Sequence, residues 1–292
     1  MSAKPEPPAS AGSTESPEPE EPAEPAEPTE PTGSPQTRPV FDAHLHIVDP
    51  RFPLVENNGY LPDPFTVDDY REANAHLTPH GFAVRGGAVV SGSFQAFDQG
   101  YLVEALAQLG PGFAGVTQLP VEIEDQEIDR LHAAGVRAVR FNVARGGSAA
   151  LDDLEHLAQR VHDRAGWHAE LYIDARTIDD DLARRIAALP AVSIDHLGMH
   201  EDGLPQLLRL VEQGVKVKAT GFGRIDMDPA RTLAAIVDVD PTALMVGTDL
   251  PSTRARRPFR PEDLALIRDT LPTEHQSAVF WQNAAEFYGV SE

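Results

Sequence analysis

Several features are missing from this sequence. It contains no cysteine, which excludes disulfides and thiolate metal sites. No apolar run approaches the roughly 18 residues that cross a membrane, and the first residues lack the basic-then-apolar pattern of a signal peptide. Positive charge is also scarce: the formal net charge is −22, so a nucleic-acid backbone would be repelled. We therefore expect a cytoplasmic protein with neither a membrane nor a nucleic-acid partner.

The beginning of the chain differs in composition from the rest. Residues 1–38 repeat proline, glutamate and alanine and contain almost nothing that could be buried. Such a segment predicts a disordered, locally extended tail. The remaining residues, 39–292, are enough for one domain, because a closed α/β barrel needs roughly 250 residues.

From Val40 onward, short apolar runs alternate with longer amphipathic segments, many of which open on aspartate and close on glycine as helix caps do. Strands buried on both faces that alternate with helices predict a parallel sheet, and eight such units predict a (β/α)8 TIM barrel, an α/β fold. The long segment 49–85 predicts a loop over the barrel mouth, then a helix near 66–80. The predicted strands are residues 40–47, 86–92, 113–119, 136–142, 168–174, 192–198, 215–221 and 243–249.

Polar residues at the C-terminal ends of these strands are the candidates for chemistry, because functional groups of this fold lie there. His44 and His46 are two residues apart, so both imidazoles point to one face and can share one ion or one substrate. Asp249 ends the eighth run and can take a proton from water or bind a metal. His196 ends the sixth run. Structural roles, such as a helix cap at Asp249 or a hydrogen-bonded core histidine, are the alternatives.

Arginines form a second group near the same ends. Arg140, Arg145 and Arg224 each carry a guanidinium fork that matches a carboxylate with two hydrogen bonds. An unpaired buried charge would be costly, so Arg140 predicts either an anionic ligand or an internal acidic partner. Arg254, Arg256 and Arg257 after the eighth strand either extend this positive rim or, as we expect, lie in a solvated loop.

The ordered set of motifs resembles the amidohydrolase-related (amidohydrolase 2) family, which includes 2-pyrone-4,6-dicarboxylate lactonases. The motifs are FDAHLH, VRFN with Arg145 beyond it, WHAELYID, IDHLG, VGTDLP and the late WQNAAEFYG, and the resemblance covers about residues 39–290. The run Ser91-Gly92-Ser93 after the second strand departs from the family's sequence.

This resemblance implies a hydrolase that opens a small carboxylated lactone. Asp249 would activate water as a general base, while His44, His46 and His196 would polarise the carbonyl and stabilise the oxyanion. The substrate's carboxylates would be held by the arginines already named, and further substrate contacts would come from Tyr60, Tyr172 and Ser93. The expected partner is thus a small anionic lactone or carboxylate, and a homo-oligomer stays open.

The cofactor also stays open. Metal-binding relatives add a bridging lysine or glutamate after strand 4 and a histidine after strand 5, where this chain has Asn142 and Tyr172. The alternatives are therefore no metal or one divalent ion, zinc or manganese, held by His44, His46, His196 and Asp249. Two other functions compete with lactone hydrolysis: a metal-dependent decarboxylase of the same superfamily, and a non-catalytic ligand-binding barrel.

Overall fold

The computed structural model describes residues 1–5 and 37–290. The predicted disordered tail over residues 1–38 therefore lies almost entirely outside the described residues, and strand β1 begins at its last residue, Arg38. None of the helices in the described part of the chain combines the length and apolarity that a bilayer crossing requires.

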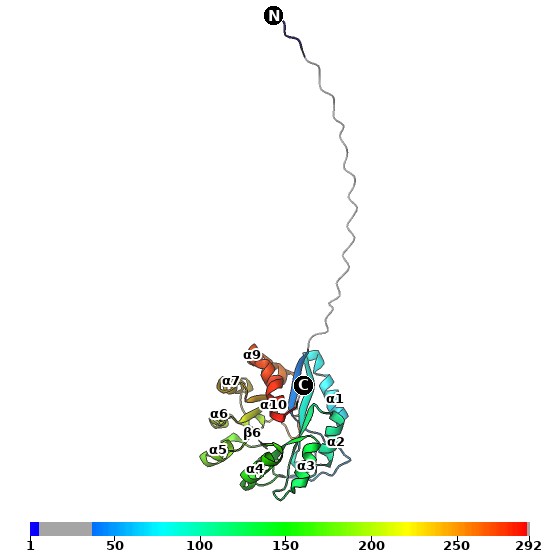
Figure 1. Ribbon diagram of the computed structural model, residues 1–292, viewed down its shortest axis with the longest axis vertical. Helices are drawn as coiled ribbons and strands as arrows, with labels where there is room; N and C mark the ends of the chain where they lie inside the picture. Colours follow the sequence, from blue (N-terminus) through cyan, green and yellow to red (C-terminus); the bar gives the residue numbers. More distant parts are fainter. Residues whose placement is uncertain (6–36, 291–292) are drawn as a thin grey trace. The chain divides into compact units, whose positions relative to one another are not determined.

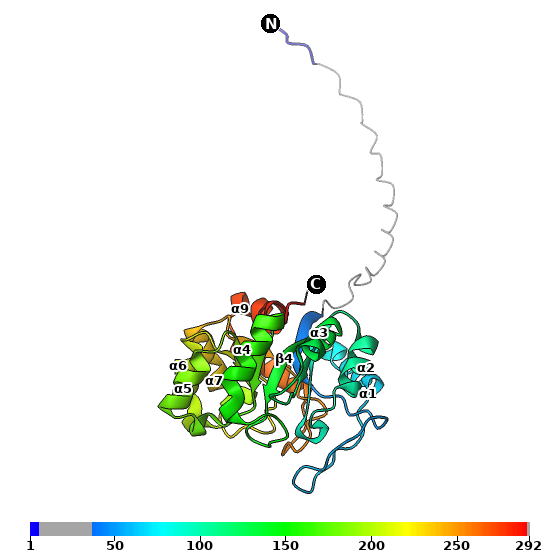
Figure 2. The same ribbon diagram turned by 60° about the horizontal axis from the view of Figure 1, so that its bottom comes forward.

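The predicted TIM barrel is confirmed. Eight parallel strands follow one another in chain order around the sheet, and Figures 1 and 2 show the helices surrounding them. The strands are β1 (Arg38–Leu45), β2 (Phe82–Val90), β3 (Phe113–Thr117), β4 (Val136–Phe141), β5 (His168–Leu171), β6 (Val192–Ile194), β7 (Lys216–Ala219) and β8 (Leu244–Val246).

Helices follow the strands at the predicted places. They are α1 (Val67–Ala75), α2 (Gly100–Leu109), α3 (Asp125–Ala133), α4 (Leu154–Ala165), α5 (Asp180–Ala187), α6 (Leu204–Val211), α7 (Pro229–Val239), α8 (Pro261–Thr270), α9 (Thr273–Ser277), the π-helical η7 (Ala278–Gln282) and α10 (Asn283–Tyr288). Single 3-10 turns are η1 (Thr78–His80), η2 (Ser93–Gln95), η3 (Leu151–Asp153), η4 (Ala175–Thr177), η5 (His196–Gly198) and η6 (Glu201–Gly203).

Aspartates start several of these helices for the expected reason. Asp179 accepts a hydrogen bond from the backbone N–H of Leu182 at the start of α5, and Asp228 accepts from two N–H groups at the start of α7. At the other end of α4, Gly166 adopts the left-handed conformation that closes a helix. Local capping therefore fixes the starts of α5 and α7 and the end of α4.

The barrel closes between its first and last strands through side chains and loop backbone. The buried Asp42 carboxylate accepts hydrogen bonds from the backbone and hydroxyl of Thr248, both at 2.7 Å, and from Tyr70 at 2.9 Å. Beyond it, the Asp249 N–H donates to the His44 carbonyl at 2.7 Å. These bonds bring the ends of β1 and β8 together.

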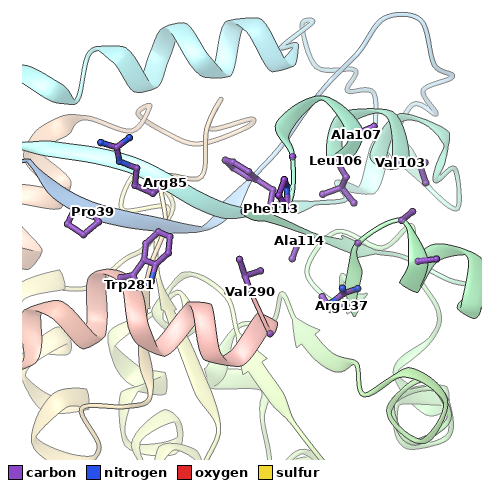
Figure 3. Close-up of a pocket in the computed structure, with 17 residues that line it drawn as sticks. Pro39, Arg85, Val103, Leu106, Ala107, Phe113, Ala114, Arg137, Trp281 and Val290 are labelled. Carbon is purple, nitrogen blue, oxygen red and sulfur yellow. The ribbon is translucent and has the colours of Figure 1, made fainter. Parts of the chain in front are cut away.

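The two ends of the barrel are filled differently. At the N-terminal end, Trp281 of η7 and Tyr288 of α10 pack against Phe41 inside the strands. Beside them lies an apolar groove of about 1060 Å³ that includes Phe113, Arg85 and Arg137 in its lining (Figure 3). The C-terminal end, which we call the mouth, is lined by polar side chains.

Candidate active site

The mouth brings together the four residues that sequence singled out. The His44 ring centroid lies 5.0 Å from that of His46 and 4.8 Å from that of His196. The Nε2 atoms of His44 and His46 are 3.9 Å and 3.5 Å from Asp249 Oδ1. All four side chains are buried. Three imidazoles and one carboxylate from β1, β6 and β8 thus meet at one centre.

Two of these residues lie in turns just beyond their strands. Strands β6 and β8 end at Ile194 and Val246, several residues earlier than predicted. His196 and Asp249 follow with φ values of 52° and 60°, in the left-handed region that residues other than glycine rarely adopt. Such conformations persist where the surrounding structure imposes them, and they cluster at active sites.

Gly221 shows how closely the backbone encloses His196. A Cβ atom at this position would lie 2.5 Å from His196 Nδ1, and the residue itself has a φ of 64°. Both the space and the backbone conformation therefore require glycine here.

Asp249 is held by an arginine that sequence had assigned to the substrate. Arg224 donates from Nε to Asp249 Oδ2 at 2.6 Å and from Nη2 to Oδ1 at 3.0 Å, a two-bond ion pair in a buried site. Burial alone would raise the pKa of Asp249, but Arg224 and the neighbouring imidazoles hold this pKa far below its usual range. In this conformation Asp249 is a stable carboxylate and a weak base.

A hydrogen bond fixes the orientation of His46, and a buried carboxylate faces His44. His46 Nδ1 lies 2.7 Å from the Val90 carbonyl oxygen, which can only accept, so Nδ1 carries a proton. His44 Nδ1 lies 3.3 Å from Asp195 Oδ1, and burial lowers the pKa of His44 to about 4 against the opposing effect of Asp195. When neutral, His46 presents an Nε2 lone pair to the mouth, so it accepts protons or a cation and cannot donate to a carbonyl.

Below the histidines lies a buried network of charges that sequence analysis did not identify. Arg140 Nη2 donates to Asp195 Oδ2 at 2.8 Å, and Lys218 Nζ lies 3.5 Å from Asp195 Oδ1. Lys218 also donates to Glu170 Oε2 at 2.5 Å. Of the two alternatives for Arg140, the internal acidic partner is therefore present, although Arg140 also lines the cavity at the mouth.

A signal for this network exists in the sequence. Lys218 and Glu170 interrupt the apolar runs VKVKATG and HAELYID on β7 and β5. Inward-pointing residues of alternate barrel strands share one layer, so opposite charges on two odd strands can meet.

The other predicted substrate contacts lie around a narrow cavity of about 30 Å³, with room for about one water molecule. Its lining includes Ser93, Arg145, Tyr172 and Arg224. Tyr60 is not part of the lining. Its ring lies 4.3 Å from the guanidinium of Arg254, and Arg254 does line the cavity.

Arg254 lines the cavity at the mouth, which corresponds to the positive-rim alternative and not to the solvated loop that was expected. It donates to the Asn57 side chain at 2.9 Å and so joins the loop after β8 to the long loop after β1. Burial lowers the pKa of Arg254, and the nearby positive charges of Arg145 and Arg224 lower it further. Tyr60 opposes this effect without reversing it. Several guanidinium groups thus converge on one cavity, which favours an anionic ligand.

The mouth also contains a candidate metal site. His44, His196 and Asp249 each offer a ligand atom, and these atoms lie within 4.8 Å of one another. Imidazole nitrogens and a carboxylate suit zinc or manganese. The donor set therefore fits one divalent ion, while Arg224, which binds both Asp249 oxygens, competes for the same carboxylate.

Comparison with known proteins places this chain among relatives. Residues 41–290 match the sequence model of the family described as Amidohydrolase. The chain is 32% identical over 162 residues to a 2-pyrone-4,6-dicarboxylate hydrolase of Comamonas testosteroni, covering 54% of this chain and 51% of that protein. It is 24% identical over 189 residues to a D-galactarolactone isomerase of Agrobacterium fabrum, covering 61% and 62%. The matched part is thus about half to three-fifths of these relatives' length.

Solved structures share the fold. A probable 2-pyrone-4,6-dicarboxylic acid hydrolase from Acinetobacter baumannii, with citric acid bound, superposes with a TM-score of 0.72 at 22% identity, over 86% of this chain and 99% of that one. At this identity the likeness supports the barrel architecture and does not assign a substrate.

Proposed function

Because this chain belongs to the Amidohydrolase family, we propose that it is a hydrolase that opens a small carboxylated lactone with a water molecule. The observation that carries this proposal is the meeting of His44, His46, His196 and Asp249 with several arginines at one mouth. The curated relatives add support, since one is named a dicarboxylate hydrolase and another a lactone isomerase.

In the proposed reaction, water attacks the lactone carbonyl, the ring C–O bond breaks, and the ring oxygen takes a proton to give a hydroxy acid. Asp249 would accept the proton of the attacking water and later return it to the leaving oxygen. Its two-bond pair with Arg224 weakens it as a base. We therefore propose that Arg224 turns from Asp249 to a carboxylate of the substrate on binding.

The size of the cavity fits this view. About 30 Å³ is too small for any lactone, so lining side chains must move when substrate enters. The long arginines are the groups that can move and still keep an anionic partner. Arg145 and Arg254 would bind the substrate from the loops, and Tyr172 and Ser93 would contact its ring.

The roles of the imidazoles follow from their protonation. With their Nδ1 atoms facing the Val90 carbonyl and Asp195, His46 and His44 would accept protons at Nε2, while carbonyl polarisation would come from His196 and the guanidinium groups. A zinc or manganese ion held by His44, His196 and Asp249 would, when bound, polarise the carbonyl or the water.

The test is turnover of a lactone panel that contains pyrone dicarboxylates, muconolactones and aldonolactones, with and without added zinc or manganese. Reaction in oxygen-18 water must place one labelled oxygen in the new carboxylate. A carboxylated lactone should be preferred over its uncarboxylated analogue. No turnover across the panel under either condition would overturn the proposal.

Two alternatives are tested alongside. The possible metal ligands His44, His196 and Asp249 favour a metal-dependent decarboxylase as the second candidate. A decarboxylase predicts a tightly held ion and carbon dioxide as a product. A non-catalytic barrel predicts ligand binding without turnover, and Asp249→Asn should not change its behaviour.

The cytoplasmic location and the possible homo-oligomer also stay predictions. Cell fractionation would check the location, and sedimentation would check the oligomeric state.

A further inference from the structure

The buried charges beneath the mouth form one connected group. Asp195, Lys218 and Glu170 have no exposed surface, and Arg140 is 2% exposed. Two cations face two carboxylates, so the group is electrically balanced. At its lower end, Glu170 accepts hydrogen bonds from the Tyr288 hydroxyl and from His168 Nε2, the latter at 3.1 Å. At its upper end, Asp195 faces His44.

His44 has a carboxylate on each side. Its Nδ1 is 3.3 Å from Asp195 Oδ1, and its Nε2 is 3.9 Å from Asp249 Oδ1. A neutral ring has one proton to share between them. Asp249 already receives two bonds from Arg224, whereas Asp195 Oδ1 and His44 Nδ1 both lack a hydrogen-bond partner among the described residues. The nearer and less satisfied acceptor is therefore Asp195.

We infer that Asp195 is a positioning residue: it holds the proton of His44 on Nδ1 and so turns the Nε2 lone pair toward the reaction centre, with Arg140 and Lys218 as its counterions. Asp195 lies on the side of His44 away from Asp249, where it contacts Arg140 and Lys218, so it acts through His44 and not on substrate. The motif IDHLG alone does not reveal this role of Asp195, because the role depends on His44, which lies on β1.

The counterions explain why Asp195 can serve as a permanent acceptor. A carboxylate without exposed surface would normally take up a proton. Here Arg140 Nη2 donates to Asp195 Oδ2 at 2.8 Å and Lys218 Nζ lies 3.5 Å from Oδ1, so two buried cations stabilise the charged form. Because Arg140 and Lys218 stabilise Asp195 as a carboxylate, Asp195 does not take the proton from His44. The proton stays on His44 Nδ1.

A carboxylate that fixes a histidine tautomer is worth orders of magnitude in rate elsewhere, because the wrong tautomer cannot accept the proton in transit. A purely structural ion pair predicts something else: loss of stability on substitution, with the tautomer of His44 unchanged. The tautomer of His44 therefore distinguishes a positioning role of Asp195 from a purely structural one.

The experiment reads the tautomer directly. Long-range proton–nitrogen correlation spectra of the full chain, labelled with nitrogen-15 histidine and kept in EDTA, report which ring nitrogen carries hydrogen. His44→Gln assigns the signal. We expect the proton of wild-type His44 on Nδ1. A proton on Nε2 overturns the inference, whether or not the variants below fold.

Asp195→Asn tests the cause. Arg140 offers only donors, so the amide oxygen should stay with Arg140 and the amide NH2 should face His44 Nδ1, moving the proton to Nε2. Turnover of a lactone substrate should then fall roughly 10²- to 10⁴-fold in kcat, with KM within about threefold. Asp174→Asn, which changes a carboxylate three residues beyond β5 that pairs with Arg176, is the matched control and should change neither measurement.

An unchanged tautomer in folded Asp195→Asn, or a moved tautomer with unchanged kcat, overturns the positioning role. The inference rests on the proposed hydrolysis only where it predicts a change in kcat. If the wild type hydrolyses no lactone, the proposed function fails, while the tautomer, which is measured without substrate, still decides whether Asp195 orients His44.

Discussion

The two ends of this barrel differ in size and in chemistry. The N-terminal groove measures about 1060 Å³ and is lined mainly by apolar groups such as Phe113, Trp281 and Val290 (Figure 3). The cavity at the mouth measures about 30 Å³. In the part of the chain that the structure describes, the one grouping of three histidine or carboxylate side chains with metal-binding separations lies at the mouth.

Unsatisfied polar atoms separate the two ends more clearly than volume does. The described residues with a buried polar side-chain atom that lacks a partner include four that line the cavity at the mouth: Arg140, Tyr172, His196 and Arg254. None of the residues lining the groove is among them. Buried polar atoms normally find partners, so atoms left without one indicate where a ligand belongs. These atoms support the proposal that the mouth, and not the larger groove, is the ligand site.

The strongest test of this contrast is Asp249→Asn. Loss of the carboxylate should reduce kcat/KM by about 10³-fold or more, since the amide cannot take a proton from water. Thermal unfolding should show a folded protein. Asp226→Asn, whose carboxylate is exposed, is the control and should keep full activity. Equal activity in both variants would remove Asp249 from the reaction.

At the opposite end, Trp281→Ala should act on stability alone. Trp281 is 7% exposed and packs edge-on against Phe41. Its truncation should cost about 3 kcal/mol of unfolding free energy, measured by urea titration, with kcat unchanged. A kcat that falls more than about threefold in the folded variant would show that the two ends are coupled.

Gly221→Ala tests the shape of the mouth. The new Cβ would contact His196 Nδ1, so we expect roughly a 10²-fold loss of kcat together with a stability loss of about 1–2 kcal/mol. Gly214→Ala is matched, because Gly214 has a φ of 89° and open space around its Cβ position. It should lose similar stability and no activity, and a similar kcat in both would contradict the steric explanation.

Acid should weaken the fold through the buried histidines. Burial lowers the pKa of His44 to about 4 and also lowers the pKa values of His196 and His168. Unfolded imidazoles titrate near 6.5, so between about pH 6.5 and 4 the unfolded chain binds more protons and stability falls as pH falls. Burial of Asp42, whose pKa rises to about 6, opposes this with a single proton.

We therefore expect the midpoint of thermal unfolding to drop by more than about 4 °C from pH 7 to pH 5 in EDTA. His168→Gln should reduce this difference, because His168 is one of the three groups. A midpoint that does not change over this range would mean that these histidines are charged in the native state.

The smallest effect is expected from Arg85→Gln in the groove. Arg85 is exposed and has no ion-pair partner among the described residues, so unfolding free energy should change by less than about 0.5 kcal/mol. Activity should be unchanged. A clear loss of turnover would assign the groove a part in the reaction.

Much of the barrel was predictable because its signals are local. Each of the eight strands was predicted from its apolar run, and the helix starts followed from caps such as Asp179 and Asp228. The strand ends near His196 and Asp249 were placed too late, because the left-handed turns there depend on packing. Partners were the least predictable: Arg224 was assigned to substrate and is bound to Asp249.

The sequence by itself determined the eight alternating units and the residue types that reach the mouth, because hydrophobic periodicity and capping act between neighbours in the chain. Only the tertiary structure decided which charges face one another. Asp195 lies 151 positions from His44, and their contact arises from barrel closure. Electrostatic partners depend on distances in space, which a one-dimensional pattern does not contain.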